Sequence, residues 1–301
     1  MHHLAVLALM LAAPPEPVET KFAQVGPVAR EAAPFQRSAE RQRAVVLLHG
    51  LHIHPFNSSN VAKAAWHGWQ KSDSILVKTL AKDSDVFAFA YGQNVAVDDI
   101  ANDDGLSFGI RELKELGYRE IVLVGHSAGG IVARQFVEDK PGAGVTKVIQ
   151  VCTPNGGSSW GKATIGVRQK QENFLTSLTK DSRQVCLAKR CDKKIPTEVD
   201  FICVIGQLQV SAGKTADAEN KDAAGKSLGG DGVVSCVCQW TKDLQEQCIP
   251  AVAIDAAHFS AMRSQQSAEK IAQFVRERQI RWDPAEVAAA RKKLLGEKER
   301  P

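Results

Sequence analysis

Short runs of β-branched, aliphatic and aromatic residues recur along the chain, and a turn residue closely follows each of them. The first run is Ala44–His49, which stops at Gly50. A continuous apolar run of this length is typical of a strand that is buried on both faces. The same pattern predicts further strands over Val86–Tyr91, Ile121–Val124, Val145–Cys152, Phe201–Ile205 and Ala251–Ile254.

Segments with apolar residues at helical spacing lie between these strands. Residues 74–81, 106–116 and 130–138 each place aliphatic side chains three or four positions apart, which is typical of an amphipathic helix. Buried strands that alternate with such helices form a parallel sheet covered on both faces. The sequence therefore predicts an α/β fold with a doubly wound, mostly parallel sheet.

Other segments break this alternation and indicate the domain organisation. Residues 155–198 are polar and too long for a simple connection between strands, so we expect a cap or lid insertion there. Residues 14–43 are rich in proline, alanine and charge and predict a linker. Residues 282–301 alternate alanine with charged residues, as a solvated terminal helix does. The predicted domain therefore spans residues 44–281.

The N-terminus carries a short apolar segment. Leu4–Ala13 contains ten apolar residues, whereas a helix needs roughly 20 to cross a bilayer. Its length and the small residues at its end fit a signal peptide over residues 1–13, and no lipobox-like cysteine follows. We therefore expect export to the periplasm or the medium, with a frayed N-terminus of a cytoplasmic protein as the alternative.

Composition and charge narrow the classes of function. The chain has 301 residues, of which 44% are hydrophobic, enough for a sizeable core. The 38 basic and 34 acidic residues are scattered, so nucleic acid is not an expected partner. The odd number of cysteines leaves at least one unpaired, and one or two disulfides would suit an exported protein. Zinc is not expected, because the paired CxxC spacing is absent from the cysteines in polar sequence, Cys186, Cys191, Cys236 and Cys238.

The most informative motif is Gly125–Gly129, which reads GHSAG and lies between a predicted strand and a predicted helix. A serine hydroxyl is a weak nucleophile that must be exposed beside a general base, and a tight strand-to-helix turn exposes it. The terminal glycines of the motif let backbones pass closely, and the helix N-terminus offers free amides to an oxyanion. The motif therefore indicates that Ser127 is a nucleophile.

At these residues the chain resembles the α/β-hydrolase superfamily, in its lipase and esterase branch, which includes PGAP1-like and triacylglycerol-lipase-like serine hydrolases. The resemblance implies a nucleophile, an acid and a histidine in that chain order. It also implies that the backbone N–H groups of Leu51 and Ala128 form the oxyanion hole, because His49-Gly50 matches the family's HG turn. The resemblance is carried by VVLLHGLH (45–52), LVGHSAGGIVAR (123–134), CTPNGGS (152–158), GGDGVVS (229–235) and AAHFS (256–260).

The general base must be a histidine near Ser127, and the chain has eight. His126 adjoins Ser127 in a sharp turn, so its side chain points elsewhere. The superfamily's order places the base after the nucleophile, which leaves His258, behind the last predicted strand. A purely structural histidine is the alternative. The order and the signal segment exclude His2, His3, His49, His52, His54 and His67.

The acid must orient His258 and stabilise its charged form. Asp231 in GGDGVVS resembles the acid turn of lipases and lies between nucleophile and base. The alternative is a plain β-turn, because Asp-Gly is a common turn dipeptide. Asp255 lies only three residues before His258, and Asp217 and Asp222 lie in a charged, glycine-rich loop. Asp231 is therefore the predicted acid.

Aromatic residues and histidines after the oxyanion turn are candidates for a substrate pocket. His52–Asn60 and Trp66–Trp69 have the composition of an acyl site for a lipidic or bulky ester, with surface packing as the alternative. A transient contact with a membrane or lipid surface fits the same side chains. His52, His54 and His67 are potential metal ligands, but a serine mechanism needs no metal or cofactor. Nothing in the sequence fixes ligands for a structural calcium.

These residues together predict a serine hydrolase that cleaves small or lipidic carboxylic esters. Ser127 would attack the ester, His258 would take its proton and Asp231 would orient His258. The alternatives are acyl transfer or amide hydrolysis by the same residues, or a catalytically inactive hydrolase fold that serves as a binding or scaffold protein. The motifs fix neither the acyl chain nor the alcohol of the substrate.

Overall fold

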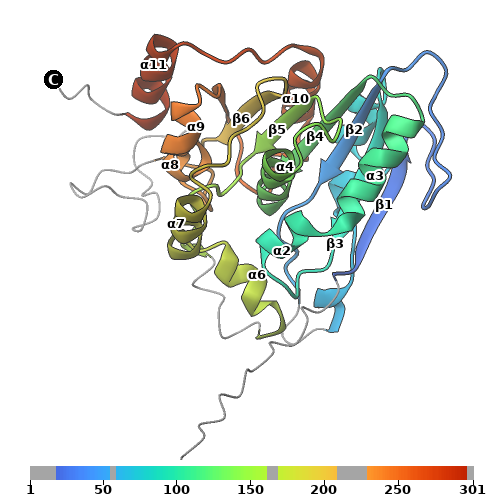
Figure 1. Ribbon diagram of the computed structural model, residues 1–301, viewed down its shortest axis with the longest axis horizontal. Coiled ribbons are helices and arrows are strands. Elements are labelled where there is room, and N and C mark those ends of the chain that lie inside the picture. The colour runs from blue at the N-terminus through green and yellow to red at the C-terminus, as the bar shows by residue number, and fades with distance from the viewer. Residues whose placement is uncertain (1–17, 55–58, 161–168, 209–228, 297–301) are drawn as a thin grey trace, which may run out of the picture.

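A seven-stranded sheet forms the centre of the computed structural model, which describes residues 18–54, 59–160, 169–208 and 229–296. The strand order is β1-β3-β2-β4-β5-β6-β7; β1 pairs with β3 in antiparallel orientation, and the other pairs are parallel. The predicted doubly wound, mostly parallel sheet is therefore confirmed (Figure 1). The strands are β1 (Thr20–Gly26), β2 (Arg43–Leu48), β3 (Asp85–Tyr91), β4 (Glu120–His126), β5 (Lys147–Val151), β6 (Asp200–Gly206) and β7 (Ala251–Ile254).

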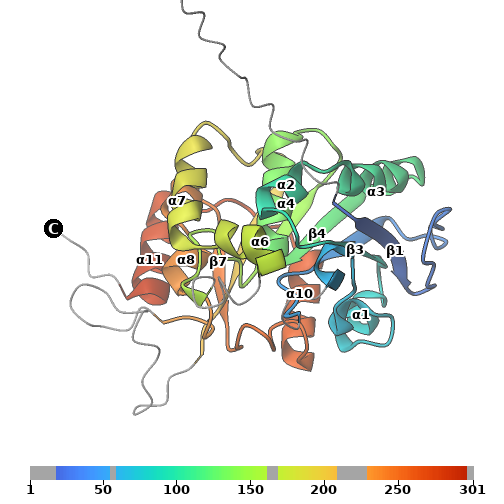
Figure 2. The ribbon, with the colours of Figure 1, turned by 90° about the horizontal axis from the view of Figure 1, so that it is seen from below.

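Helices cover both faces of the sheet (Figure 2). One face packs against α1 (Ile75–Leu80) and α10 (Gln265–Arg276). The opposite face packs against a larger set: α2 (Val97–Asn102), α3 (Asp104–Glu115), α4 (Ala128–Asp139), α6 (Glu172–Ser177), α8 (Cys236–Gln239), α9 (Lys242–Glu246) and α11 (Pro284–Leu295). Helix α7 (Lys180–Lys189) and the 3-10 segments Ser59–Ala62, Gly68–Gln70 and Gln169–Gln171 complete the described elements.

The central strands are mostly apolar because each of them contributes side chains to two cores. Val46 and Leu48 of β2 belong to the core under α3 and α4, whereas Val45 and Leu47 belong to the core under α1 and α10. Successive side chains of a strand point to opposite faces, so a strand between two helical layers has no polar face. Each of these buried side chains stabilises the fold by roughly 1.5–3 kcal/mol relative to exposure.

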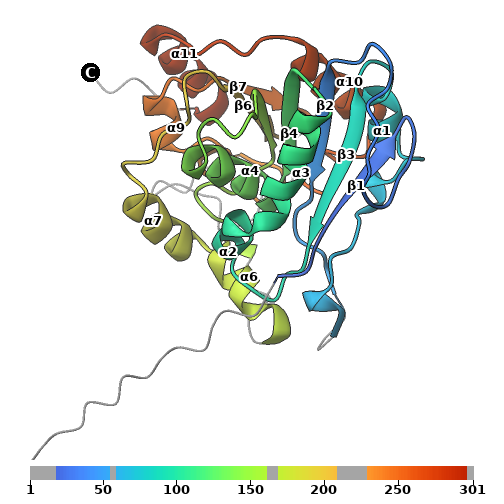
Figure 3. The ribbon, with the colours of Figure 1, turned by 45° about the vertical axis from the view of Figure 1, so that its right-hand side comes forward.

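The predicted linker over residues 14–43 is wrong in part, because it contains β1. This strand lies at the edge of the sheet, beside β3 (Figure 3). Its sequence, TKFAQVG, mixes polar and apolar residues, and only three of its positions are buried. An edge strand with one neighbour tolerates such a mixed sequence, so it lacks the apolar run that marks the central strands.

The C-terminal segment is not fully solvated, in contrast to the prediction for residues 282–301. Helix α11 begins behind Asp283, whose carboxylate accepts a hydrogen bond from the Glu286 backbone N–H at 2.8 Å. Val287 and Leu294 lie seven residues apart on one side of this helix and are buried in the core. Alanines cover most sides of this helix, so Val287 and Leu294 give too weak a period to predict the contact.

Several sequence predictions fall partly or wholly outside the described residues. The signal peptide over 1–13 lies outside them entirely, and the cap over 155–198 is interrupted at 161–168, so both stay predictions. All seven cysteines are unbridged, so the expected disulfides are not formed in the structure. None of the helices in the described ranges combines the length and apolarity that crossing a bilayer requires.

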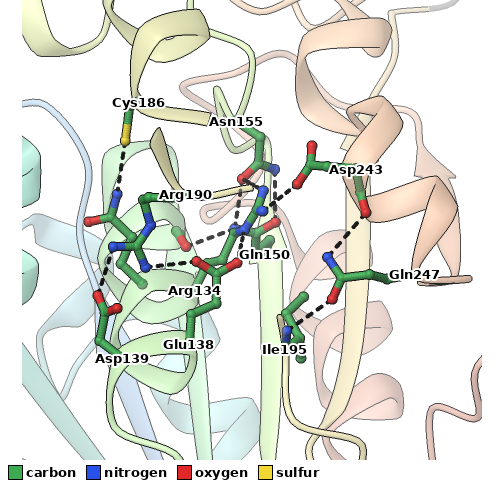
Figure 4. Close-up of polar contacts among 12 residues, drawn as sticks. Arg134, Glu138, Asp139, Gln150, Asn155, Cys186, Arg190, Ile195, Asp243 and Gln247 are labelled. Atoms are coloured by element: carbon green, nitrogen blue, oxygen red, sulfur yellow. Dashed lines mark hydrogen bonds and ion pairs between the residues drawn. The ribbon is translucent and has the colours of Figure 1, made fainter. Parts of the chain in front are cut away.

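A buried network of charges holds α7 and α9 against α4, the helix that follows Ser127 (Figure 4). Arg134 of α4 pairs with Glu138 at 2.7 Å and also with Asp243 of α9. Arg190, at the end of α7, bonds Glu138 at 2.9 Å and Asp139 at 2.8 Å. Removing one partner of a buried pair leaves an uncompensated charge, which costs about 3–5 kcal/mol. The network therefore fixes α4 relative to α7 and α9.

Candidate active site

Ser127 lies in a strained turn between β4 and α4. Its backbone has φ 54° and ψ −126°, a conformation that costs a non-glycine residue about 1–3 kcal/mol. The flanking glycines make the turn possible, because a Cβ on Gly125 would lie 2.5 Å from the Gly129 carbonyl oxygen. A Cβ on Gly129 would lie 2.4 Å from the His49 carbonyl oxygen. The sequence prediction of a close backbone passage at both glycines is therefore confirmed.

Three side chains far apart in the sequence form one hydrogen-bonded row. The Ser127 Oγ lies 3.0 Å from His258 Nε2, and His258 Nδ1 lies 2.8 Å from Asp231 Oδ2. All three residues are buried, with exposed fractions of 5%, 4% and 1% in that order. A carboxylate can only accept, so the Nδ1 atom carries the proton and Nε2 presents its lone pair to the serine hydroxyl. The structure thus brings together the three residues that the sequence nominates.

Asp231 is held by several donors besides His258. Its Oδ1 atom accepts from the backbone N–H groups of Val233 at 2.9 Å and Val234 at 2.7 Å. The thiol of Cys152, directly after β5, also hydrogen bonds to this carboxylate. These donors leave Oδ2 aimed at His258. In the sequence Cys152 is only the end of the predicted strand Val145–Cys152, and no local motif marks it as a donor to the carboxylate.

His126 supports the loop that carries His258. Its Nε2 atom donates to the His258 carbonyl oxygen at 2.9 Å. Burial lowers the pKa of His126 well below its usual range, and the neighbouring His258 lowers it further. A neutral His126 places no positive charge beside His258, whose ring centroid is 5.0 Å away. His126 therefore positions the loop that carries His258, and its side chain does not act on Ser127.

The turn after β2 lies directly against the serine. A Cβ on Gly50 would lie 2.5 Å from the Ser127 Cβ, so only glycine fits there. The His49 ring orders this turn: Nδ1 donates to the Gly50 carbonyl oxygen at 2.7 Å, and Nε2 accepts from the Tyr91 backbone N–H at 3.2 Å. Among the described residues, no hydrogen-bond acceptor lies against the backbone N–H of Leu51 or Ala128.

A cavity of about 50 Å³ opens beside Ser127 and His258. Its wall is mostly apolar and combines residues from the turn after β2, the segment around α6 and the two loops that carry Asp231 and His258. The predicted pocket residues His67 and Trp69 line it, whereas Trp66 does not. The sequence did not mark the remaining lining residues as part of a pocket: Pro154, Ser158, Trp160, Leu175, Leu178, Val233, Val234, Phe259 and Arg263.

Within the described residues, neither Asp255 nor the histidine cluster forms an alternative site. Asp255 is exposed, and the carboxylate on His258 Nδ1 is that of Asp231; Asp217 and Asp222 lie outside the described residues. The ligand atoms of His49, His52 and His67 lie within 4.8 Å of one another. Both ring nitrogens of His49 are used, however, and the rings of His52 and His67 stack at 3.8 Å. Stacked rings cannot aim both lone pairs at one ion.

Comparison with known proteins gives a result at the level of the fold. No protein-family model and no curated protein sequence matches the chain. The mature lipase BlEst2 of Bacillus licheniformis aligns with a TM-score of 0.55 at 16% identity, over 81% of this chain and 96% of that one. Its propeptide form gives a TM-score of 0.59 at 14% identity, over 88% of this chain and 55% of that one.

A phospholipase gives a similar result. Phospholipase PlaB of Legionella pneumophila has a TM-score of 0.56 at 14% identity, with 85% of this chain and 63% of that one aligned. Identities this low carry the backbone architecture and not the activity. The chain therefore has the α/β-hydrolase fold found in these lipase and phospholipase structures.

Proposed function

We propose that this protein is a serine hydrolase that cleaves carboxylic esters, with Ser127, His258 and Asp231 as its catalytic triad. The observation that carries the proposal is the hydrogen-bonded row, with 3.0 Å from Ser127 Oγ to His258 Nε2 and 2.8 Å from His258 Nδ1 to Asp231 Oδ2. A base within hydrogen-bond reach of the nucleophile, itself oriented by a third group, is the geometry of nucleophilic catalysis.

The reaction follows from this geometry in two halves. Ser127 Oγ attacks the ester carbonyl carbon while its proton passes to His258 Nε2, and the imidazolium that forms is stabilised by Asp231. His258 then gives the proton to the departing alcohol, which leaves an ester between the acyl group and Ser127. In the second half, His258 takes a proton from water as the water attacks the acyl carbon. The acid leaves and Ser127 recovers its proton.

The oxyanion of each tetrahedral intermediate is assigned to the backbone N–H groups of Leu51 and Ala128. The Ala128 N–H is the first of α4, so the positive end of the helix dipole adds to it. Both N–H groups lack an acceptor among the described residues, which leaves them available to a substrate oxygen. Losing one such donor typically costs 100- to 1000-fold in kcat, or about 2.7–4 kcal/mol.

The mostly apolar wall favours an uncharged acyl chain over a charged one. Leu175, Leu178, Val233 and Val234 all face the cavity beside Ser127. Such a wall suits an acyl chain, and a PGAP1-like or triacylglycerol-lipase-like substrate falls within this class. Exposed apolar side chains lie near the same mouth, with Phe259 49% exposed, which fits a transient contact with a lipid surface.

The test is hydrolysis of p-nitrophenyl esters from acetate to palmitate by the wild type and by Ser127→Ala. We expect Ser127→Ala to lose several orders of magnitude in kcat/KM while it keeps the wild-type fold. Ser84→Ala is the matched control, because Ser84 is also fully buried but bonds Asp83, away from the row. Equal activity of wild type and Ser127→Ala would refute the proposal.

A fluorophosphonate probe separates the remaining alternatives. Labelling of Ser127 without release of any p-nitrophenol would indicate an active nucleophile with another acyl acceptor or an amide substrate. The absence of both labelling and turnover would indicate an inactive binding protein. Export is proposed separately on residues 1–13, and N-terminal sequencing of the protein from cell fractions tests it.

A further inference from the structure

The carbonyl group of Gly50 and the N–H group of Leu51 belong to one peptide unit. The unit is planar and trans, so whatever fixes the carbonyl oxygen also fixes the direction of the N–H. This oxygen accepts from His49 Nδ1 at 2.7 Å and from Gln93 Nε2 at 2.9 Å, and the His67 ring also hydrogen bonds to it. A carbonyl that accepts hydrogen bonds also polarises its own N–H, which strengthens that N–H as a donor.

Gln93 clamps the turn from both sides. It follows β3, and it is only 1% exposed. While its Nε2 atom donates to the Gly50 carbonyl oxygen, its Oε1 atom accepts from the His52 backbone N–H at 3.0 Å. The two bonds enclose Leu51 and fix the peptide units before and after it. No motif in the sequence indicates that Gln93 has this role.

Gln171 completes the clamp from a distant part of the chain. Its Nε2 atom donates to the Gln93 Oε1 atom at 2.7 Å and to the His52 carbonyl oxygen at 3.0 Å. The first bond orients the Gln93 amide, since an acceptor that receives Gln171 must be the oxygen and not the nitrogen. Gln171 is 1% exposed and immediately precedes α6, whose Leu175 lines the cavity.

We infer that Gln93 and Gln171 are positioning residues that set the oxyanion hole: Gln93 fixes the Leu51 N–H, and Gln171 fixes Gln93. This inference rests on the proposed function, because it assigns a role within the same site. Gln171 also links the cavity wall formed by α6 to the oxyanion turn, so a substrate that packs against Leu175 contacts the helix that follows Gln171.

The test uses methionine substitutions, which keep the volume of glutamine but remove its polar atoms. Gln93→Met should lower kcat about 10- to 100-fold, less than the complete loss of one oxyanion donor, with KM changed less than threefold. Gln171→Met should lower kcat about 5- to 10-fold in the same way. The double variant should be no slower than Gln93→Met, because Gln171 acts through Gln93.

Gln24→Met is the matched control. Gln24 is also 1% exposed and makes the same pair of bonds to a loop, donating to the Gln36 carbonyl oxygen at 2.8 Å and accepting from the Gln36 N–H at 3.0 Å. It lies on β1, at the edge of the sheet. We expect it to lower the melting temperature about as much as Gln93→Met while leaving kcat within twofold of wild type.

Hydrogen exchange provides a second readout that does not depend on turnover. Residues 49–54 should exchange faster in Gln93→Met and Gln171→Met than in the wild type and in Gln24→Met. Faster exchange together with a selective loss of kcat supports the inference. Unchanged exchange, or losses of kcat that multiply in the double variant, would overturn it. Absence of Ser127-dependent hydrolysis in the wild type would instead count against the proposed function, and the exchange result would still decide whether the clamp exists.

Discussion

Replacing Asp231 by asparagine changes one side-chain atom and reverses the direction of the hydrogen bond between residue 231 and His258 Nδ1. Asp231 Oδ1 accepts from two backbone N–H groups, those of Val233 and Val234. In Asp231→Asn the side-chain oxygen must stay on these two donors, because an NH₂ group facing them would oppose two N–H dipoles. The asparagine NH₂ then faces His258 Nδ1, which must accept.

The consequence falls on the other side of the ring. An accepting Nδ1 atom forces the proton of neutral His258 onto Nε2, which faces Ser127 Oγ at 3.0 Å. Nε2 then has no lone pair to take the serine proton, and the imidazolium loses its carboxylate. A wrong tautomer of this kind lowers kcat by about 10⁴, which corresponds to roughly 5.4 kcal/mol at 1.36 kcal/mol per factor of ten.

The assay compares kcat for p-nitrophenyl butyrate in the wild type, Asp231→Asn and Asp85→Asn. Asp85 is also buried and accepts from Ser38 Oγ and Tyr118 OH, both at 2.6 Å, but it lies away from the row. We expect Asp85→Asn to lose stability and keep its kcat per folded molecule. If Asp231→Asn retained more than a tenth of wild-type kcat, the orienting role derived above would be refuted.

Three further predictions follow from the site. In Gly50→Ala the new Cβ would lie 2.5 Å from the Ser127 Cβ, so we expect ester hydrolysis to fall at least about 100-fold, whereas Gly68→Ala, with no atom within 4 Å of its Cβ, should hydrolyse like the wild type. Burial first, and then the nearby His52, lowers the pKa of His67 to about 3. The unfolded chain takes up this proton below about pH 6.5 and the folded chain does not, so urea denaturation should show that this residue makes the protein about 2 kcal/mol less stable at pH 5 than at pH 7. His67→Gln should remove this difference. The same dependence of stability on pH in wild type and His67→Gln would contradict the prediction. One water molecule needs about 10–15 Å³ of such a cavity, so the cavity of about 50 Å³ has room for about four groups of that size. We therefore expect kcat/KM to be highest for acetyl to butyryl esters; a maximum at palmitate would show that the acyl chain lies elsewhere.

The central strands were predictable from the sequence, and the peripheral elements were not, for one physical reason. Strands such as β2 and β4 are buried on both faces, so their composition is constrained at every position. β1 has one neighbour and a mixed burial pattern. α11 has only two buried positions, Val287 and Leu294. An element can be predicted from its hydrophobic pattern only when many of its positions are buried, and β1 and α11 have few buried positions.

The same reasoning separates the parts of the candidate site. Ser127 stands in a turn that only a few residue types can form, so its surroundings are visible as a motif. Asp231 and His258 lie after strand ends in the order that the fold allows. Gln93 and Gln171 act through side-chain amides that many surface glutamines also carry, and only the folded chain shows that they meet at 2.7 Å. Residues that act through a partner leave no pattern along the chain.

The sheet topology explains why these side chains meet despite their separation in sequence. Parallel strands place their carboxyl ends at one edge, where α/β folds carry their sites. Gly50 follows β2, Ser127 follows the adjacent β4, and Cys152 follows β5, which pairs with β4 on one side and β6 on the other. Cys152 therefore lies between the serine and the Asp231 loop that leaves β6, where its thiol contacts the carboxylate. Asp231 comes after β6 and His258 after the adjacent β7, and the His258 backbone N–H donates to the Asp231 carbonyl oxygen at 2.9 Å, so the two loops hold each other. This arrangement gives the site the rigid support that proton transfer over 3.0 Å requires.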